Sequence, residues 1–183
     1  MHKTRFSSLL SATQSLLQHQ RCTVTAIGRG IDSDTCEKHS IKRADRLLSN
    51  NKLLAEMPCI YALMTRAILA NSKHPIILVD WSNADTRKQN HILRASLALE
   101  GRSLTLLQMV ASTDDYNSPR VHSQFLKRLK LMLSDDCKPV IVTDAGFKVP
   151  WFKEVRKSGW HFIGRVRGNQ HVKLPEHDEF ISV

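Results

Sequence analysis

The spacing of apolar residues along the chain changes character near Pro75. Before this proline, apolar residues recur three and four positions apart, which is typical of amphipathic helices. After it, short β-branched runs such as IILVD alternate with longer helical stretches, and runs of this kind are typical of buried strands. The pattern predicts a helical domain at residues 1–74 and a second domain of mixed strands and helices at residues 75–183.

The second half of the chain predicts the element order β-β-β-α-β-α-β. Its expected elements are the strand IILVD, two strands in HILRASLALEGRSLTLLQMV joined at EGR, the helix SPRVHSQFLKRLKLMLS, the strand PVIVTD, the helix VPWFKEVRKSG and the strand WHFIGRVRG. Strands joined by short turns pair antiparallel, and strands separated by a helix pair parallel. The predicted fold class is therefore α/β, with a mixed sheet and helices on its faces. The last stretch, NQHVKLPEHDEFISV, has no period and predicts no element.

The clearest helix is expected to begin after Ser118. A serine hydroxyl accepts a backbone N–H at a helix start, and proline fits the first turn that follows it. The apolar residues at helical spacing are expected to face the core, and they are Val121, Phe125, Leu129 and Met132. Trp81 and Trp151 are also expected to serve core packing rather than base stacking.

A basic helix is predicted in CEKHSIKRADRLLSN. It follows a short helix in TVTAIGRGI and a Gly/Asp turn, and this order resembles a helix-turn-helix. Lys38, Lys42 and Arg46 form a row with one helical turn between neighbours, and Arg43 lies beside the row. Such a row can contact phosphates, although a charged surface helix of any bundle has the same spacing.

Composition narrows the class of protein. The 183 residues hold 27 Lys and Arg against 17 Asp and Glu, a net charge of +10 that favours binding to polyanions, nucleic acid first. A solvated basic surface is the alternative. No apolar run approaches the roughly 20 residues that span a bilayer, and no signal peptide begins the chain, so a cytoplasmic protein without membrane contact is expected. The four cysteines and nine histidines lack ligand spacing, which predicts buried cysteines and neither zinc nor disulfides.

Two of the predicted strands end on a carboxylate, Asp80 in one and Asp144 in the other. If these strands are neighbours the carboxylates converge, and two carboxylates repel each other unless a cation lies between them. Mg²⁺ prefers oxygen ligands of this kind, and paired ions support phosphodiester chemistry. Turn formation or helix capping is the alternative for such aspartates, and Asp85 could replace Asp80 in the pair.

Several longer stretches then resemble one family. IKRADRLLSN, PIILVDWS, LRASLALEGRSLTL and PVIVTDAGFKVPWF…GWHFIGRVRG are similar to the cut-and-paste transposases of bacterial insertion sequences, in the insertion-sequence-four group that includes the insertion-sequence-ten transposase. The resemblance covers about residues 20–170 and implies an RNase H-like catalytic domain behind a helical DNA-binding domain. Asp80 in VDWS matches the first catalytic carboxylate of the family and Asp144 in TDAGF the second.

The resemblance also implies cofactors and partners. Enzymes of this family cleave DNA at element ends and join the freed 3′-hydroxyl to a target, with two divalent ions (Mg²⁺ or Mn²⁺) and as a homodimer on the double-stranded terminal repeats. The expected location is the bacterial cytoplasm, on the nucleoid. Contacts to element ends are expected from Lys38, Lys42, Arg43 and Arg46, and contacts to DNA near the catalytic carboxylates from Arg165 and Arg167.

The chain departs from the family at the third catalytic carboxylate. In the family this is a glutamate on a later helix, in a Tyr…Arg…Glu…Lys pattern, and Glu154, Glu176 and Glu179 do not have that context. The expectation is the N-terminal portion of a transposase, from a truncated or interrupted gene, with an incomplete RNase H-like domain. We expect such a portion to expose apolar side chains on one sheet face and not to transpose DNA alone. A non-catalytic DNA-binding competitor and an inert product are the alternatives.

Overall fold

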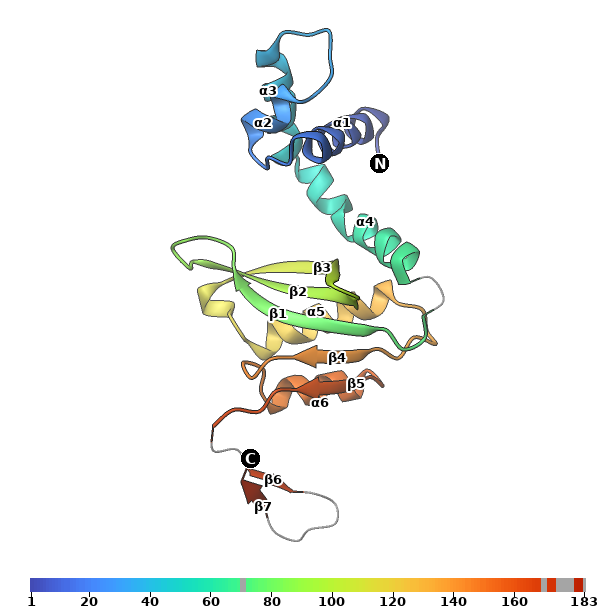
Figure 1. Ribbon diagram of the computed structural model, residues 1–183, viewed down its shortest axis with the longest axis vertical. Coiled ribbons are helices and arrows are strands. Elements are labelled where there is room, and N and C mark those ends of the chain that lie inside the picture. Colours follow the sequence, from blue (N-terminus) through green and yellow to red (C-terminus); the bar gives the residue numbers. More distant parts are fainter. Residues whose placement is uncertain (70–71, 169–170, 174–179, 183) are drawn as a thin grey trace. The chain divides into compact units, whose positions relative to one another are not determined.

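The computed structural model describes residues 1–69, 72–168, 171–173 and 180–182 (Figure 1). Backbone contacts divide the chain into two compact units, Met1–Ile60 and Tyr61–Val183, and each is described by itself. The division falls within helix α4 (Asn51–Leu69), whose second half packs with the sheet. The change from helices to strands comes after α4, where β1 begins at Ile76.

The first unit is helical, as the sequence predicts. It consists of α1 (Lys3–His19), α2 (Val24–Arg29), α3 (Glu37–Leu48) and the first part of α4. Its core is a small cluster of buried apolar side chains contributed by all four helices and the turn after α2, namely Ala12, Ile27, Ile31, Ala44, Leu47 and Leu53. The short helix, the turn and the basic helix expected from the sequence are α2, the segment 30–36 and α3.

Close backbone packing holds α2 against α3. A Cβ atom added to Gly28 would lie 2.4 Å from the Ile41 Cα, so only glycine allows the two helices to approach this closely. The first helix is held to α4 by a bidentate ion pair, in which Arg5 Nε and Nη2 lie 2.9 and 2.6 Å from the Glu56 carboxylate oxygens. The Arg5 guanidinium holds the pKa of the Glu56 carboxyl below its usual value.

The second unit is built on a five-stranded mixed sheet of the order β3-β2-β1-β4-β5 (Figure 1). The strands β1, β2 and β3 pair antiparallel, and β4 and β5 continue the sheet from β1 in parallel. The predicted mixed α/β fold is confirmed, and the architecture agrees with an RNase H-like fold. The elements are β1 (Ile76–Asn83), β2 (Asn90–Leu99), β3 (Arg102–Ser112), the 3-10 turn η1 (Thr113–Asp115), α5 (Pro119–Met132), β4 (Val140–Thr143), α6 (Val149–Lys157) and β5 (His161–Gly164).

Helices α5 and α6 pack on the same face of this sheet. The crossovers from β3 to β4 and from β4 to β5 run in the same direction across the sheet, so right-handed connections place both helices on one side. Ser118 caps α5, as predicted, and the four predicted apolar residues of α5 are buried in the same core as Ile77, Ile141 and Trp151. Both tryptophans pack there, which confirms that expectation: Trp151 is 1% exposed, and Trp81 is half-buried against the core.

The opposite face of the sheet carries the alternate residues of the same strands. Leu78 of β1 lies beside Val142 of β4, which lies beside Ile163 of β5. Leu78 is 38% exposed and Ile163 is 61% exposed, and no helix among the described residues packs over them. Exposed apolar side chains on one sheet face, expected from the sequence, are therefore present.

Two expectations from the sequence were wrong. The last stretch contains a short antiparallel pair, β6 (His171–Lys173) with β7 (Phe180–Ser182), and strands of three residues are too short to show a period. The cysteines were expected to be buried, but Cys137 alone of the four is. Three lie on the solvent side of the helical region, namely Cys22, Cys36 and Cys59.

No helix in the described part of the chain is long and apolar enough to cross a membrane.

Candidate active site and nucleic-acid interface

The two predicted carboxylates lie at equivalent positions of neighbouring parallel strands. Val79 of β1 pairs with Thr143 of β4, and Asp80 and Asp144 are the residues that follow them. Val79 and Thr143 are buried on the helix-covered face, whereas Asp80 and Asp144 are exposed, as alternation along a strand requires. Because neighbouring strands lie about 4.8 Å apart, this register places the two aspartates side by side on the uncovered face.

The two carboxylates differ in their local hydrogen bonds. Asp144 Oδ1 accepts the Gly146 backbone N–H at 2.9 Å, so this aspartate also forms the turn that follows β4, which was the structural alternative for it. The Asp80 side chain makes no hydrogen bond or ion pair with any other described residue. Its carboxylate and the Asp144 Oδ2 atom are therefore free to bind a ligand.

Asp85, the alternative to Asp80, has a structural role in the loop between β1 and β2. Its Oδ1 accepts the Gln89 backbone N–H, and its Oδ2 accepts the backbone and side-chain N–H groups of Asn90. The Gln89 bond is the main reason that the pKa of the Asp85 carboxyl lies below its usual value. The loop occupies both oxygens of Asp85, so the pairing of Asp80 with Asp144 is the better ligand set.

The predicted basic residues of the sheet unit lie at the same end of the sheet. Gly164 of β5 pairs with Thr143, and Arg165 follows it, so Arg165 continues the row that contains Asp144. The Arg165 backbone N–H donates to the Thr143 carbonyl oxygen at 3.1 Å, which fixes this register. Arg167 lies two residues further along, beyond the end of β5, and both arginines are exposed.

An aromatic cluster supports this end of the sheet from the covered face. The Trp81 indole Nε1 donates to His122 Nε2 of α5 at 3.3 Å, and the His122 ring stacks on Phe147, which follows Asp144 by three residues. Trp151 meets the same imidazole edge to face. Burial among these rings lowers the pKa of His122 to about 4, so the ring is neutral and its Nε2 accepts the hydrogen bond from the indole N–H. The backbone beside each aspartate is thus anchored to one histidine.

The donor set fits one divalent cation better than two. Oxygens of two carboxylates, completed by water and a substrate phosphate, are typical ligands of Mg²⁺. Among the described residues, no group of three or more His, Cys, Asp or Glu side chains could hold a metal together. Glu154 lies on α6 and pairs with Lys157, whereas Glu176 and Glu179 fall outside the described residues.

In the helical unit, the predicted basic residues divide into two groups. Lys38, Lys42 and Arg46 are exposed along α3, and Arg46 Nε donates to the Lys42 carbonyl oxygen. Arg43 is half-buried, and its guanidinium donates to the hydroxyls of Ser8 and Ser11 on α1. Arg43 therefore stabilises the packing of α1 against α3, while the other three remain available to a ligand.

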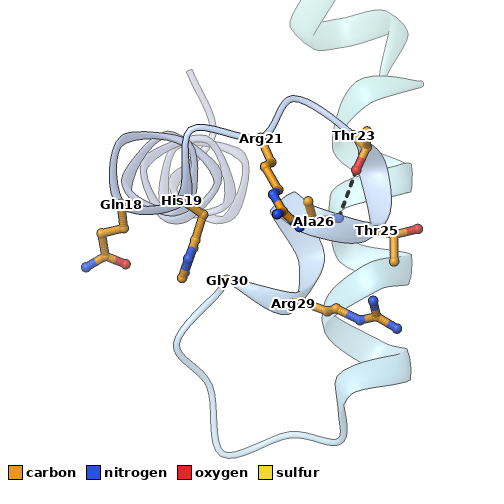
Figure 2. A pocket seen from close by; sticks show the side chains of 8 residues that line it. All are labelled: Gln18, His19, Arg21, Thr23, Thr25, Ala26, Arg29 and Gly30. Carbon is orange, nitrogen blue, oxygen red and sulfur yellow. Dashed lines mark hydrogen bonds between the residues drawn. The ribbon is translucent and has the colours of Figure 1, made fainter.

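The helical unit has two open hollows with basic linings. One of about 530 Å³ lies along α3 and is lined in part by Arg5, His39, Arg43 and Arg46. The other, of about 660 Å³, lies at the end of α1 and is lined in part by His19, Arg21, Thr25 and Arg29. Figure 2 shows Arg21 between α1 and α2, with the Thr25 and Arg29 side chains pointing away from α1. Arg29 Nε donates to the Glu37 carboxylate at the start of α3 at 2.8 Å.

Sequence reasoning missed three features of these sites. His122 has no motif around it, and only its place on the buried stripe of α5 indicated that it would lie in the core. Arg21 precedes α2 and Arg29 is its last residue, so no periodic row joined them. Arg94 alternates with the buried residues Leu93 and Ala95, and that alternation could have placed it on the same face as Asp80.

Comparison with known protein families gives one match over this part of the chain. The model described as "Transposase DDE domain" matches residues 71–180, which include the whole five-stranded sheet and both aspartates. Neither the curated proteins nor the solved structures give a match. Because the matched segment is more than half of the 183 residues, the chain belongs to the transposase family defined by this DDE domain.

Proposed function

We propose that this chain binds the double-stranded ends of an insertion sequence and takes part in their cut-and-paste transposition, as in the insertion-sequence-four group that includes the insertion-sequence-ten transposase. Residues 1–74 form the DNA-binding domain and residues 75–183 the RNase H-like part that carries catalytic carboxylates. The protein works as a homodimer on DNA, in the cytoplasm and on the nucleoid. The observation that carries the proposal is the register of Asp80 and Asp144 on neighbouring strands, within the segment that matches the family.

In this proposal Asp80 and Asp144 hold Mg²⁺ or Mn²⁺. The bound ion supplies activation of an attacking oxygen and stabilisation of the leaving oxygen in phosphodiester chemistry. The chain itself contributes a fixed pair of carboxylates, because β1 and β4 set their separation and the Asp144–Gly146 hydrogen bond sets the turn. The Trp81–His122 hydrogen bond keeps the end of β1 in place from the covered face.

Metal binding is tested by thermal unfolding of the whole chain during a titration with Mn²⁺ or Mg²⁺. A ligand that binds only the folded state stabilises it, by about 1.4 kcal/mol at ten times its Kd. We expect Tm to rise with metal in the natural chain, and the rise to vanish in Asp80→Asn and in Asp144→Asn. Asp85→Asn is the matched control and keeps the rise, because the loop occupies both Asp85 oxygens. An equal rise in all four proteins would remove the carboxylate pair from the proposal.

DNA binding by the helical unit is tested through its dependence on salt. Each phosphate contact contributes about 0.9 to the slope of log K against log salt. Replacing Lys38 and Lys42 together by alanine should therefore lower the slope by nearly 2. The control replaces Lys153 and Lys157 of α6, which removes the same charge from the other unit. If the two double variants behave alike, α3 is not the DNA-contacting helix.

A DNA-binding role without catalysis is the second candidate. The basic hollows and the Lys38–Lys42–Arg46 row favour it, because they belong to the helical unit and use no residue of the sheet. A cleavage and strand-transfer assay with metal separates the two candidates. Joined products that require both Asp80 and Asp144 support catalysis, whereas DNA binding without such products supports the competitor.

A further inference from the structure

An arginine lies directly beside Asp80 on the uncovered face of the sheet. Arg94 of β2 is the cross-strand partner of Asp80, and Gln108 of β3 is the partner of Arg94 on its other side. Arg94 is exposed, and the residues before and after it, Leu93 and Ala95, are buried on the opposite face. With Arg165 beyond Asp144, the row across the sheet reads Gln108, Arg94, Asp80, Asp144 and Arg165.

The Arg94 guanidinium is held by the neutral side-chain amide of Gln108 and not by the carboxylate of Asp80. Arg94 Nε and Nη2 lie 2.7 and 3.1 Å from the Gln108 side-chain oxygen, which must be the atom facing them because a guanidinium only donates. No ion pair joins Arg94 to Asp80 or to any other carboxylate among the described residues. Gln108 therefore orients the fork of Arg94 without neutralising its charge, and Asp80 stays free to bind a cation.

The ligand that suits this arginine is a phosphate group. A guanidinium presents parallel N–H groups that match phosphate oxygens, and Arg94 keeps its Nη1 N–H groups free of partners in the described part of the chain. A phosphate of a DNA strand over the carboxylate pair would lie within about one strand spacing of Arg94. We propose that Arg94, oriented by Gln108, binds a backbone phosphate of the DNA strand positioned at Asp80 and Asp144.

This inference rests on the proposed function and adds a binding residue on β2. A purely structural role is the competing account, in which Arg94 and Gln108 form a cross-strand pair that stabilises β2 against the edge strand β3. If Arg94 binds a phosphate, its substitution changes the affinity for DNA. If Arg94 has a purely structural role, its substitution changes only the stability of the fold.

The test measures the binding of the whole chain to a labelled DNA duplex across a series of salt concentrations. Arg94→Ala should lower the slope of log K against log salt by about 0.9, since one phosphate contact is lost. Arg102→Ala is the matched control, because Arg102 is exposed at the far end of the same hairpin, and it should leave the slope unchanged. Arg94→Lys should keep the slope but weaken binding, because lysine keeps the charge and loses the fork.

Gln108→Leu tests the orienting role. It should weaken binding about as much as Arg94→Lys in the natural chain and have no further effect in Arg94→Ala. The inference is overturned if Arg94→Ala and Arg102→Ala give the same slope, whether or not Arg94→Ala lowers Tm. If the natural chain binds no DNA, the proposed function fails together with the inference. If the natural chain binds DNA and loses affinity only in the Lys38 and Lys42 variant, the proposed function stands and the Arg94 contact fails.

Discussion

The two faces of the five-stranded sheet are made by alternate residues of the same strands, yet they differ in almost every physical respect. On the covered face Ile77 is 0% exposed and packs with α5 and α6, and the same holds for Ile141 of β4. The uncovered face carries Leu78 of β1, which is 38% exposed, and the exposed carboxylate of Asp80. One face holds the fold together, and the other presents charge and apolar surface to a ligand or partner.

This difference shows how a strand serves two purposes at once. A shift of one residue in register would exchange the faces, so burial of Ile77 and Val79 fixes the direction in which Asp80 points. The aromatic cluster on the covered face also fixes this direction, because Trp81 donates a hydrogen bond to His122 there while Asp80 faces solvent. Residues that stabilise the fold therefore alternate along the strand with residues that could bind a ligand. Substitutions at adjacent positions should for this reason have very different effects on stability.

The largest contrast is expected between Ile77→Ala and Leu78→Ala. Truncating a fully buried isoleucine removes apolar contacts and leaves a cavity, at a cost of about 2–5 kcal/mol. Leu78 loses far less because it is partly exposed and no helix of the described residues covers it, so its cost should stay below about 1 kcal/mol. Urea unfolding followed by circular dichroism measures both values. Equal costs would mean that a further part of the molecule buries the Leu78 face.

The next effect is a pH dependence that comes from His122. Its pKa is about 4 in the folded chain because of burial, against about 6.5 when unfolded. Between these values the unfolded chain binds the proton more readily, so the stabilisation is complete above pH 6.5 and is lost as pH falls towards 4. This difference between the folded and unfolded pKa corresponds to at most about 3–4 kcal/mol.

The measurement for His122 compares unfolding free energies at pH 7 and pH 4.5 in the natural chain and in His122→Gln. Glutamine does not take up a proton, so the variant should lose this part of the pH dependence while keeping the part that comes from carboxyl groups. If both proteins lose the same stability over this range, His122 does not titrate as its burial implies.

A smaller effect is expected from Trp81→Phe. The ring remains to pack against Tyr116 and His91, but the indole N–H that donates to His122 is lost. A buried acceptor without its donor costs about 1–3 kcal/mol. In a double-mutant cycle with His122→Gln the two losses should not add, because both remove the same hydrogen bond. Additive losses would show that this hydrogen bond contributes nothing to the fold.

Much of the covered face could be predicted from the sequence, and for a local reason. The cap at Ser118, the proline in the first turn and the apolar stripe of α5 are all set by residues within a few turns of one another. The hairpin between β2 and β3 was equally clear, because Gly101 supplies the positive φ of its turn. Local chemistry of this kind does not depend on the rest of the fold.

The uncovered face could be predicted only in part. The sequence placed both Asp80 and Asp144 at strand ends, which is correct for Asp144 after β4 but wrong for Asp80, because β1 continues to Asn83. Their juxtaposition depends on β4 pairing with β1, whose paired residues Ile76 and Val140 are 64 residues apart. The Arg94–Gln108 contact depends further on the register across the bulge between Ala95 and Ser96, and no local pattern encodes that register. The role of Arg43 in joining α1 to α3 was missed for the same reason, since its partners lie on another helix.

The smallest expected effect is a slight gain of stability in Asp80→Asn when no metal is present. Like charges on adjacent strands destabilise a sheet by roughly 0.2–1 kcal/mol, and asparagine removes one of the two charges without changing the shape of the side chain. The gain stays slight because asparagine also loses the attraction to Arg94, the cross-strand partner of Asp80. The gain should shrink at high salt, because both groups are exposed and salt screens their repulsion. Asp114→Asn is the control, because Asp114 lies in the turn η1 and away from the pair, and it should give no gain. Urea unfolding in the presence of a chelator, at low and at high salt, measures the effect. A loss of stability in Asp80→Asn at both salt concentrations would show that the Asp80 carboxylate stabilises the fold. In that case the two carboxylates of the uncovered face would not lower the stability of the sheet.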